Sequence, residues 1–263
     1  MDLPMLLAAG AVAGTLAGLL GIGGGIVIVP IVTLLFETQG LAHGFAIKMA
    51  LGTSLATIIV TAISSIYTHH RKAAVEWGLF RIMAPGALVG SLIGAWLADI
   101  IPGEILYIAF ILFMFLVSIQ MATSRVSAHR GGLPGPLGLS GFSTGVGIIS
   151  ALMGVGGGSM NVPFLSFFGV PIKRSIATAA AIGLPLSVSA TIGYIIGGLD
   201  ETGRPPLSIG YVNLPVFGGV VAASLLFAPL GATLAHKLSD RLLRRLFAIF
   251  LFVLASRMSF KLF

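Results

Sequence analysis

Two glycine-rich segments carry the pattern in this chain that is best suited to binding chemistry. The first reads GLLGIGGGIVIVPIV (18–32) and the second reads SALMGVGGGSMNVPFL (150–165). Dense glycine disfavours helix, because each Gly costs about 1 kcal/mol relative to Ala inside a helix. A helix that restarts after such a cluster leaves its first backbone N–H groups without acceptors, and these groups carry a partial positive charge. Both segments therefore indicate a place where backbone amides could bind an anion.

The second segment adds polar side chains that the first one lacks. Ser159 and Asn161 stand where the first segment has Ile26 and Ile28. These side chains could bind oxygen atoms of a ligand, or they could make hydrogen bonds to a neighbouring helix.

Hydroxyl side chains begin two further apolar segments at matching positions of the two halves. Thr53 and Ser54 follow Lys48, and Thr178 follows Lys173 at the same spacing as Thr53 follows Lys48. Such hydroxyls either contact a ligand or bond back to their own helix, and the coincidence of the two threonines favours ligand contact. The candidate ligand-binding residues are Gly23, Gly24, Gly25, Thr53, Ser54, Gly156, Gly157, Gly158, Ser159, Asn161 and Thr178, and Gly21, Pro30, Gly154 and Pro163 are expected to have structural roles.

Close helix packing is the alternative explanation for the glycines, because small residues let membrane helices approach one another. We expect packing at the four-residue spacings Gly14/Gly18, Gly86/Gly90/Gly94 and Gly141/Gly145. We expect ligand binding at the denser clusters 21–25 and 154–158. A nucleotide-binding loop fits poorly, since no strand–helix alternation surrounds the clusters and no Lys-Ser/Thr follows them.

The composition is that of an integral membrane protein. The 263-residue chain is 57% hydrophobic and only 9% charged, with a mean hydropathy of +1.07. Several apolar runs exceed the roughly 18 residues that a membrane span needs. The scattered Lys and Arg residues exclude a nucleic-acid surface, and the absence of Cys excludes disulfides and thiolate ligands. The first Lys or Arg is Lys48, so we expect no cleaved secretory signal.

Eight apolar blocks divide the chain, four in each half, at 3–36, 45–68, 79–99, 104–122, 137–168, 175–197, 211–236 and 242–259. The first block of each half is longer than one ordinary span and contains the glycine cluster. A break at the first cluster leaves pieces of roughly 16 and 11 residues, which at about 1.5 Å per residue are too short for a hydrocarbon core of about 30 Å. We therefore predict two half-helices that meet at a glycine turn inside the membrane.

An internal repeat relates the two halves. Residues 19–30 match 152–163, 47–53 match 172–178, and 94–98 match 231–235, in the same order. Collinear matches of this kind indicate a duplicated unit. We predict a first transmembrane repeat in residues 1–122, a cytoplasmic linker in 123–136 and a second transmembrane repeat in 137–263.

The positions of Lys and Arg favour a hairpin path for each long block. If each long block enters the membrane and returns, loops 69–81, 123–136, 169–174 and 237–245 share a side that holds eleven of the 15 Lys and Arg residues. Such a bias obeys the positive-inside rule, whereas a single crossing by each long block removes it. The prediction is an all-α polytopic membrane protein with two inverted repeats, each with one broken hairpin helix and three spanning helices, and with both termini outside.

Ionisable groups are sparse within the predicted spans. Lys48, Lys173 and Arg174 lie near span ends, where they either extend to the membrane surface or attract anions. All eight acidic residues lie in or near loops, so no carboxylate for proton coupling is expected at depth. Adjacent His69 and His70 without carboxylates do not make a metal site.

The sequence resembles the TauE/SafE sulfite exporter family, also called the toluene sulfonate uptake permeases (TSUP). The resemblance rests on the doubled GLLGIGGGIVIVP and ALMGVGGGSMNVP, on GTS (52–54), on SIGYVNLP (208–215) and on SDRLLRRLFAIFLF (239–252). It implies a multi-pass permease of a prokaryotic inner membrane for sulfite, organosulfonates or other small sulfur-containing anions. The family motif falls on Gly21, Gly23, Gly24, Gly25 and Pro30, and on Gly154, Gly156, Gly157, Gly158 and Pro163.

We therefore expect a secondary transporter, an exporter of such anions, that works by alternating access with no enzymatic step and no cofactor. A passive anion channel is the alternative, because the same amides could line a pore. A membrane enzyme or accessory subunit is a third hypothesis, but the predicted spans hold no nucleophile–base pair. The expected partners are a small anionic substrate and the lipid bilayer, without nucleic acid; homo-oligomerisation, the identity of the anion and the coupling ion stay open.

Overall fold

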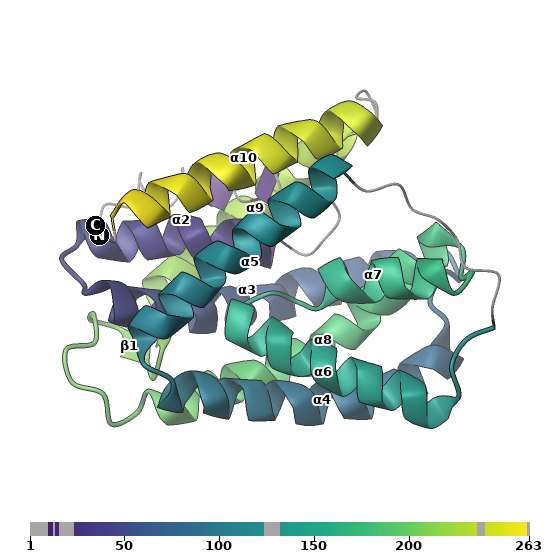
Figure 1. Ribbon diagram of the computed structural model, residues 1–263, viewed down its shortest axis with the longest axis horizontal. Helices are drawn as coiled ribbons and strands as arrows, with labels where there is room; N and C mark the ends of the chain where they lie inside the picture. Colours follow the sequence, from purple (N-terminus) through teal and green to yellow (C-terminus); the bar gives the residue numbers. More distant parts are fainter. Residues whose placement is uncertain (1–9, 13, 16–23, 124–131, 236–239, 262–263) are drawn as a thin grey trace.

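The computed structural model describes residues 10–12, 14–15, 24–123, 132–235 and 240–261 (Figure 1). These residues are mainly helical, as the sequence predicts. The first half provides α2 (Gly25–Thr38), α3 (His43–Arg71), α4 (Trp77–Ile100) and α5 (Gly103–Thr123). The second half provides α6 (Pro136–Met153), α7 (Gly158–Phe167), α8 (Ile172–Gly197), α9 (Leu214–Ala235) and α10 (Asp240–Phe260).

A small hairpin departs from the all-α prediction. Strands β1 (Ser208–Ile209) and β2 (Val212–Asn213) pair antiparallel between α8 and α9, with Ser208 opposite Asn213. The hairpin occupies part of the sequence SIGYVNLP, where Gly210 has a φ of 55° that suits a turn.

Five helices among the described residues are long and apolar enough to cross a membrane, namely α3, α4, α5, α6 and α8. The glycine-flanked α2 is a shorter apolar helix of 14 residues. Large apolar side chains such as Leu112 and Leu116 on α5 are exposed, as lipid-facing side chains are. The fold is therefore that of an all-α polytopic membrane protein.

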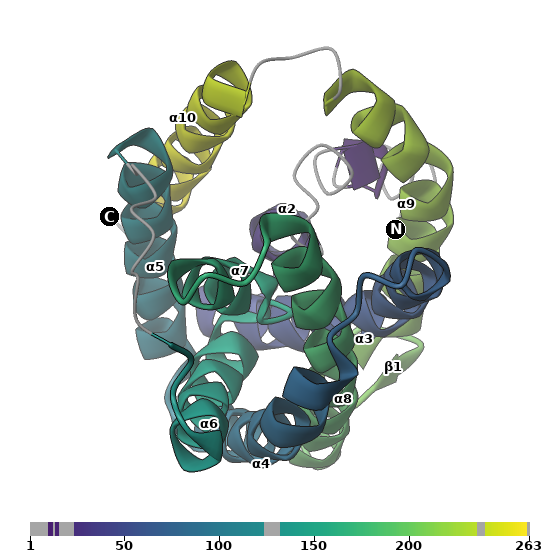
Figure 2. The ribbon, with the colours of Figure 1, turned by 90° about the vertical axis from the view of Figure 1, so that its right-hand side faces the viewer.

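The two long helices α3 and α8 form the centre of the molecule and run antiparallel. Ala177 and Ala181, near the start of α8, pack with Val75 and Ile66, at and beyond the last turns of α3. In the end-on view of Figure 2, α5 and α10 lie on one side of this pair and α9 on the other. The glycine-flanked helices α2 and α7 pack against α3 and α8, respectively.

Glycine spacing explains the close contact of α4 with α6. A β-carbon at Gly86, Gly90 or Gly94 would overlap backbone carbonyl oxygens of α6, so only glycine fits there. The prediction of packing is confirmed for these three residues. It is wrong for Gly141 and Gly145, whose β positions have open space around them. Gly14 packs on Ser224, whereas Gly18 lies outside the described residues.

The molecule has two ends, which we name by their basic residues. At the Lys48 end, α3 begins and α4 and α8 finish, and Lys48 Nζ lies 2.7 Å from the carbonyl oxygen of Asp99. At the Arg174 end, α3 finishes and α4 and α8 begin, and Arg174 pairs with Glu76. Helix α2 finishes at the Lys48 end, close to the start of α3, and α7 finishes at the Arg174 end, close to the start of α8.

Candidate functional site

The second glycine segment interrupts its helix at the predicted position. Helix α6 ends at Met153, and α7 begins at Gly158. Gly154 and Gly157 have φ values of 63° and 72°, in the left-handed region that glycine adopts without strain. The glycines therefore end one helix and start the next within four residues, as dense glycine predicts.

The chain reverses its direction at this break. The ring of Phe142 on α6 stacks on that of Phe164 on α7, with centroids 3.5 Å apart. Because Phe142 lies before the break and Phe164 after it, α7 must run back beside α6 (Figure 1). The broken hairpin helix predicted for the second half is present.

The turn lies deep in the molecule, beside the two central helices. Ser54 of α3 donates a hydrogen bond of 2.9 Å from its Oγ to the carbonyl oxygen of Gly154. A β-carbon at Gly183 of α8 would lie 2.7 Å from the carbonyl oxygen of Gly156. Ser54 and Gly183 are both well inside their helices, so the turn is remote from either end of the molecule.

Consecutive backbone amides at the start of α7 have no hydrogen-bond acceptor in the part of the chain that the structure describes. The N–H groups of Met160 and Asn161 donate to the carbonyl oxygen of Gly157, at 3.2 and 2.9 Å. The four preceding N–H groups, of residues 156–159, have no acceptor among the described residues. Such a run, at the positive end of a helix dipole, is suited to bind an anion.

Buried polar side chains without partners surround the same turn. Asn161 is completely buried, and neither its Oδ1 nor its Nδ2 has a hydrogen-bond partner among the described residues. The Oγ atoms of Ser159 and Ser150 are also buried, and no described residue pairs with them. A β-carbon at Gly157 would lie 3.2 Å from Asn161 Nδ2 and 3.6 Å from Ser150 Oγ, so both groups face this glycine. Each unpaired buried group costs about 1–3 kcal/mol.

Ser150 was not predicted as a site residue from the sequence, although the sequence around it distinguishes it from its repeat-matched position. It lies in the last turn of α6, directly before the glycine cluster, and the corresponding residue of the first half is Ala17. A polar residue that replaces an apolar one in the repeat is the same signal that identified Ser159 and Asn161.

A cavity of about 50 Å³ adjoins the glycine turn and extends between α3 and α8 toward the Arg174 end. At about 10–15 Å³ per water centre, it has room for a few waters or a small polyatomic ion. Asn161 and Ser150 are not part of its wall. The lining residues are Ile58, Thr61, Ala62 and Ser65 of α3, Ile176, Ala179, Ala180 and Gly183 of α8, and Gly156, Gly158 and Val162.

The first glycine segment also restarts a helix and touches the second. Gly24 has a φ of 74° and directly precedes α2, which begins at Gly25. A β-carbon at Gly25 would lie 2.6 Å from the carbonyl oxygen of Gly154 and 3.1 Å from Cα of Val155. Gly21 and Gly23 lie outside the described residues. The motif prolines Pro30 and Pro163 lie inside α2 and α7.

The two repeat-matched threonines bind loop amides instead of lining the cavity. Thr53 Oγ1 accepts a hydrogen bond of 3.1 Å from the N–H of Asn213, the residue before α9. Thr178 Oγ1 accepts one of 3.0 Å from the N–H of Glu76, the residue before α4. The structure thus gives both hydroxyls a structural partner, and a threonine of each half holds a helix start of the other half.

Lys48 is buried and has a structural contact. Its side chain donates to the Asp99 carbonyl oxygen and lies 5.7 Å from the ring centroid of Tyr211. Burial raises the pKa of Tyr211 and the Glu201 carboxylate raises it further, so the phenol stays protonated and donates to Glu201 at 3.0 Å. Lys173, which matches Lys48 in the repeat, is exposed.

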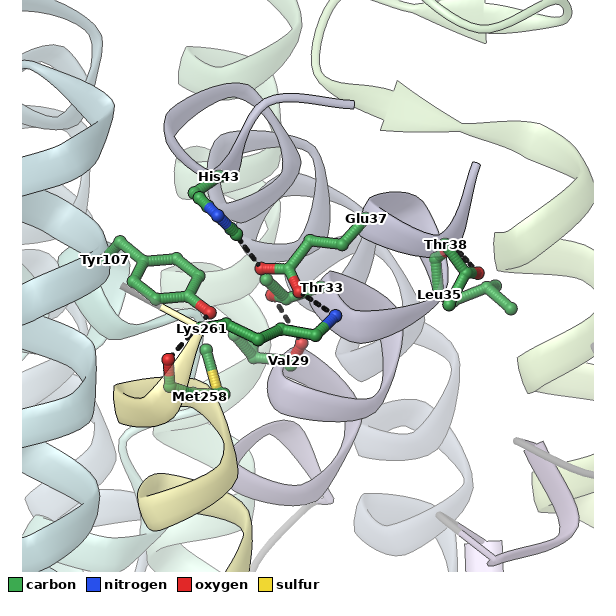
Figure 3. A network of polar contacts seen from close by, with 9 residues as sticks. All are labelled: Val29, Thr33, Leu35, Glu37, Thr38, His43, Tyr107, Met258 and Lys261. Carbon is green, nitrogen blue, oxygen red and sulfur yellow. Dashed lines mark hydrogen bonds and ion pairs between the residues drawn. The ribbon is translucent and has the colours of Figure 1, made fainter. Parts of the chain in front are cut away.

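A buried carboxylate lies at the end of α2, where the sequence analysis expected a loop residue. The Glu37 side chain is 3% exposed and binds His43 Nδ1 at 2.9 Å and Lys261 Nζ at 2.7 Å (Figure 3). Tyr107 lies beside it and donates to the carbonyl oxygen of Met258 at 3.4 Å. This network connects α2 and α3 to the end of α10 and lies away from the glycine turn.

Comparisons with known proteins agree with the architecture. The family model described as sulfite exporter TauE/SafE matches residues 6–258. A probable membrane transporter protein of Haemophilus influenzae is 34% identical over 266 residues, which cover 98% of each chain. Another from Methanocaldococcus jannaschii is 32% identical, over 92% of this chain and 90% of the relative. YunE of Bacillus subtilis, also a probable membrane transporter protein, is 27% identical over 99% and 98%.

No solved structure matches the chain. The family match extends over both glycine segments and over the described helices from α2 to α10, apart from the last two residues of α10. Together with the five apolar helices long enough to span a bilayer, it identifies a multi-pass membrane transporter. The chain belongs to the sulfite exporter TauE/SafE family.

Proposed function

We propose that the protein is a secondary transporter that exports small sulfur-containing anions, such as sulfite or organosulfonates, across the inner membrane of a prokaryote. The observation that carries this proposal is the run of amides at 156–159 that have no acceptor among the described residues, two of whose glycines line the cavity between α3 and α8. Binding is noncovalent and needs no cofactor.

The amides bind the anion through its oxygen atoms. The start of a helix carries about half a positive charge, which attracts an anion without a buried Lys or Arg. Glycine at 156–158 lets the ligand approach the backbone, because no β-carbon holds it away. The cavity beside the turn supplies the covered space that irregular backbone needs inside a membrane.

Two features support inverted repeats, with residues 1–122 and 137–263 as the units and 123–136 as a cytoplasmic linker. Helices α2 and α7, which follow the two glycine clusters, run toward opposite ends of the molecule. The hydrogen bonds of Thr53 and Thr178 are also reciprocal, since each threonine binds the residue before a helix of the other half. Reciprocal contacts of this kind arise when two like units pack around a twofold axis.

The distribution of space supports alternating access. The cavity lies on the Arg174 side of the glycine turn. On the Lys48 side, the same two helices pack with the completely buried side chains of Leu51, Leu55, Leu186 and Ser187. The positive-inside rule assigns the Arg174 end to the cytoplasm, so this conformation is open toward the cytoplasm and closed toward the outside. Rocking of one half against the other would close the cytoplasmic side and open the outer side.

Transport by purified protein in liposomes tests the proposal. Gly156→Leu would place a side chain in the cavity wall, and we expect it to abolish sulfite flux. Gly145→Leu on α6 is the matched control, because open space surrounds its β position, and its flux should equal that of the native protein. Unchanged flux in Gly156→Leu would refute the site, and single-channel currents would refute the carrier mechanism.

Cysteine accessibility tests the orientation, since the chain contains no Cys. Ala73 and Thr202 are exposed in loops at the Arg174 and Lys48 ends, respectively. In intact cells, an impermeant thiol reagent should label Thr202→Cys and leave Ala73→Cys unlabelled. The reverse pattern would contradict the proposed topology.

A further inference from the structure

The unpaired groups around Gly157 include a strict acceptor as well as donors. The backbone N–H groups of 156–159 only donate, and the hydroxyls of Ser150 and Ser159 can donate or accept. The Asn161 amide has both functions, and neither its donor nor its acceptor has a partner among the residues that the structure describes. Since neither amide atom has a partner, exchanging Oδ1 and Nδ2 in the assignment does not alter this conclusion.

A fully deprotonated oxyanion would satisfy only part of this set. Its oxygen atoms accept from the backbone amides, the serine hydroxyls and Asn161 Nδ2. It has no hydrogen to give to Asn161 Oδ1, which would stay buried and unpaired. A ligand with its own N–H or O–H group would satisfy the donors and the acceptor together.

The charge of the site favours a single negative charge. No Lys, Arg or His of the described chain lines the cavity, and its wall is mostly apolar. The helix start offers only about half a positive charge. A second negative charge would therefore be buried without compensation, which is costly.

We propose that Ser150 and Asn161 complete the anion site and make it selective for a monoanion that carries its own hydrogen-bond donor. This inference rests on the proposed function and specifies its ligand. Ser150 and Asn161 act as specificity-determining residues, because the backbone amides bind any small oxyanion.

Asn161 lies next to the cavity but is not part of its wall, so a ligand can contact it only after a local movement. The amide touches Gly157, and the neighbours of Gly157, Gly156 and Gly158, line the cavity. The polar atoms of Asn161 have almost no exposed surface in this conformation. The first helical turn of α7 must therefore shift when a ligand binds. The left-handed glycines Gly154 and Gly157, which lie at the two ends of the glycine turn between α6 and α7, are suitable pivots.

Sulfamate and methanesulfonate provide a matched pair of probes. Both are monoanions of the same size, and they differ in having an amino group or a methyl group on sulfur. We expect the purified native protein to bind sulfamate about tenfold more tightly than methanesulfonate, as one buried hydrogen bond predicts. Sulfate, a dianion, should bind more weakly than either. Isothermal titration calorimetry measures all three.

Variants connect the preference to the two side chains. Asn161→Leu keeps the branched outline of the side chain but replaces its polar atoms with methyl groups, and it should bring the ratio of the two affinities close to one. Ser150→Ala should reduce the ratio several-fold. Ser143→Ala is the matched control, because Ser143 is also buried and unpaired on α6, two turns before Ser150. It should leave the ratio unchanged.

The outcomes separate this inference from the proposed function. Equal affinity of the native protein for sulfamate and methanesulfonate, or an unchanged ratio in both Asn161→Leu and Ser150→Ala, would overturn the selectivity and leave anion transport standing. Failure of the native protein to bind any of the probes or sulfite would overturn both. A lower melting temperature in Asn161→Leu does not affect the reading, because the ratio compares two ligands on one variant.

Discussion

Where both are described, the two glycine segments have the same backbone geometry at the start of a helix but differ in their surroundings. Each has a left-handed glycine, Gly24 or Gly157, directly before a helix that begins with another glycine. The start of α2 is apolar and buried, and its Gly25 packs on the backbone of the other turn. The start of α7 adjoins a cavity and is surrounded by unpaired polar groups. In the proposed repeat the two copies thus have the same backbone geometry at the helix start, and we propose that their side chains give one copy a packing role and the other a binding role.

Alanine at Gly25, the first residue of α2, and at Gly157, the residue before α7, should show the largest difference between the copies. Gly25→Ala would place a β-carbon against backbone atoms that cannot rotate away, so we expect a loss of stability of about 1–3 kcal/mol. At position 157 the backbone is left-handed, which costs an alanine about 1–2 kcal/mol. The new β-carbon of Gly157→Ala would also press on Asn161, so sulfite affinity should fall at least tenfold. Thermal unfolding and calorimetric titration measure both effects on each variant.

The assignment of roles fails if the two variants behave alike. In particular, Gly25→Ala with native stability and greatly weakened binding would show that the first copy binds the ligand too. Gly145→Ala serves as the control for both, because its β position is open.

Replacement of the two repeat-matched lysines should also affect stability differently in the two halves. Lys48 is buried and its ammonium group donates a hydrogen bond to the backbone carbonyl oxygen of Asp99, so Lys48→Met should cost about 1.5–3 kcal/mol. Lys173 is exposed, and Lys173→Met should change stability by less than about 0.5 kcal/mol. Denaturant unfolding of both variants gives the two values. Equal losses of stability would contradict this contrast, because they would show that Lys173 is buried in the native protein as Lys48 is.

Local physics explains which features could be predicted from the sequence. The helix restarts at Gly25 and Gly158 and the break after Met153 depend on glycine alone, so they could be read directly. The membrane class depends on composition, which needs no fold. The packing of Gly86, Gly90 and Gly94 was predictable from spacing, but spacing alone also gave Gly141 and Gly145, which face open space.

Long-range contacts explain what could not be predicted. The hydroxyl of Thr53 meets the backbone of Asn213, and that of Thr178 meets the backbone of Glu76, and no local pattern identifies such partners. The burial of Glu37 depends on Lys261 from the far end of the chain. The side chains of the proposed site were partly predictable, because Ser159 and Asn161 break the apolar pattern of the repeat, whereas Ser150 was missed.

The smallest expected effect concerns a contact that the two halves do not share. Ser54 bonds to Gly154 on the Lys48 side of the turn, and its repeat-matched residue, Ala179, lines the cavity on the Arg174 side. Ser54→Ala removes that hydrogen bond, which should cost about 0.5–1.5 kcal/mol. Ala179→Ser adds a hydroxyl to the cavity wall and should leave stability within about 0.5 kcal/mol.

A reporter on the closed side shows whether the Ser54 bond also holds that side shut. Ser187 of α8 is completely buried there, so Ser187→Cys should react slowly with an impermeant thiol reagent. If the Ser54 bond stabilises the closed side, adding Ser54→Ala should raise the reaction rate several-fold, and adding Ala179→Ser should not. An unchanged rate with the expected loss of stability would make the bond a packing contact only, and the difference between the two sides would then depend on Leu51, Leu55 and Leu186.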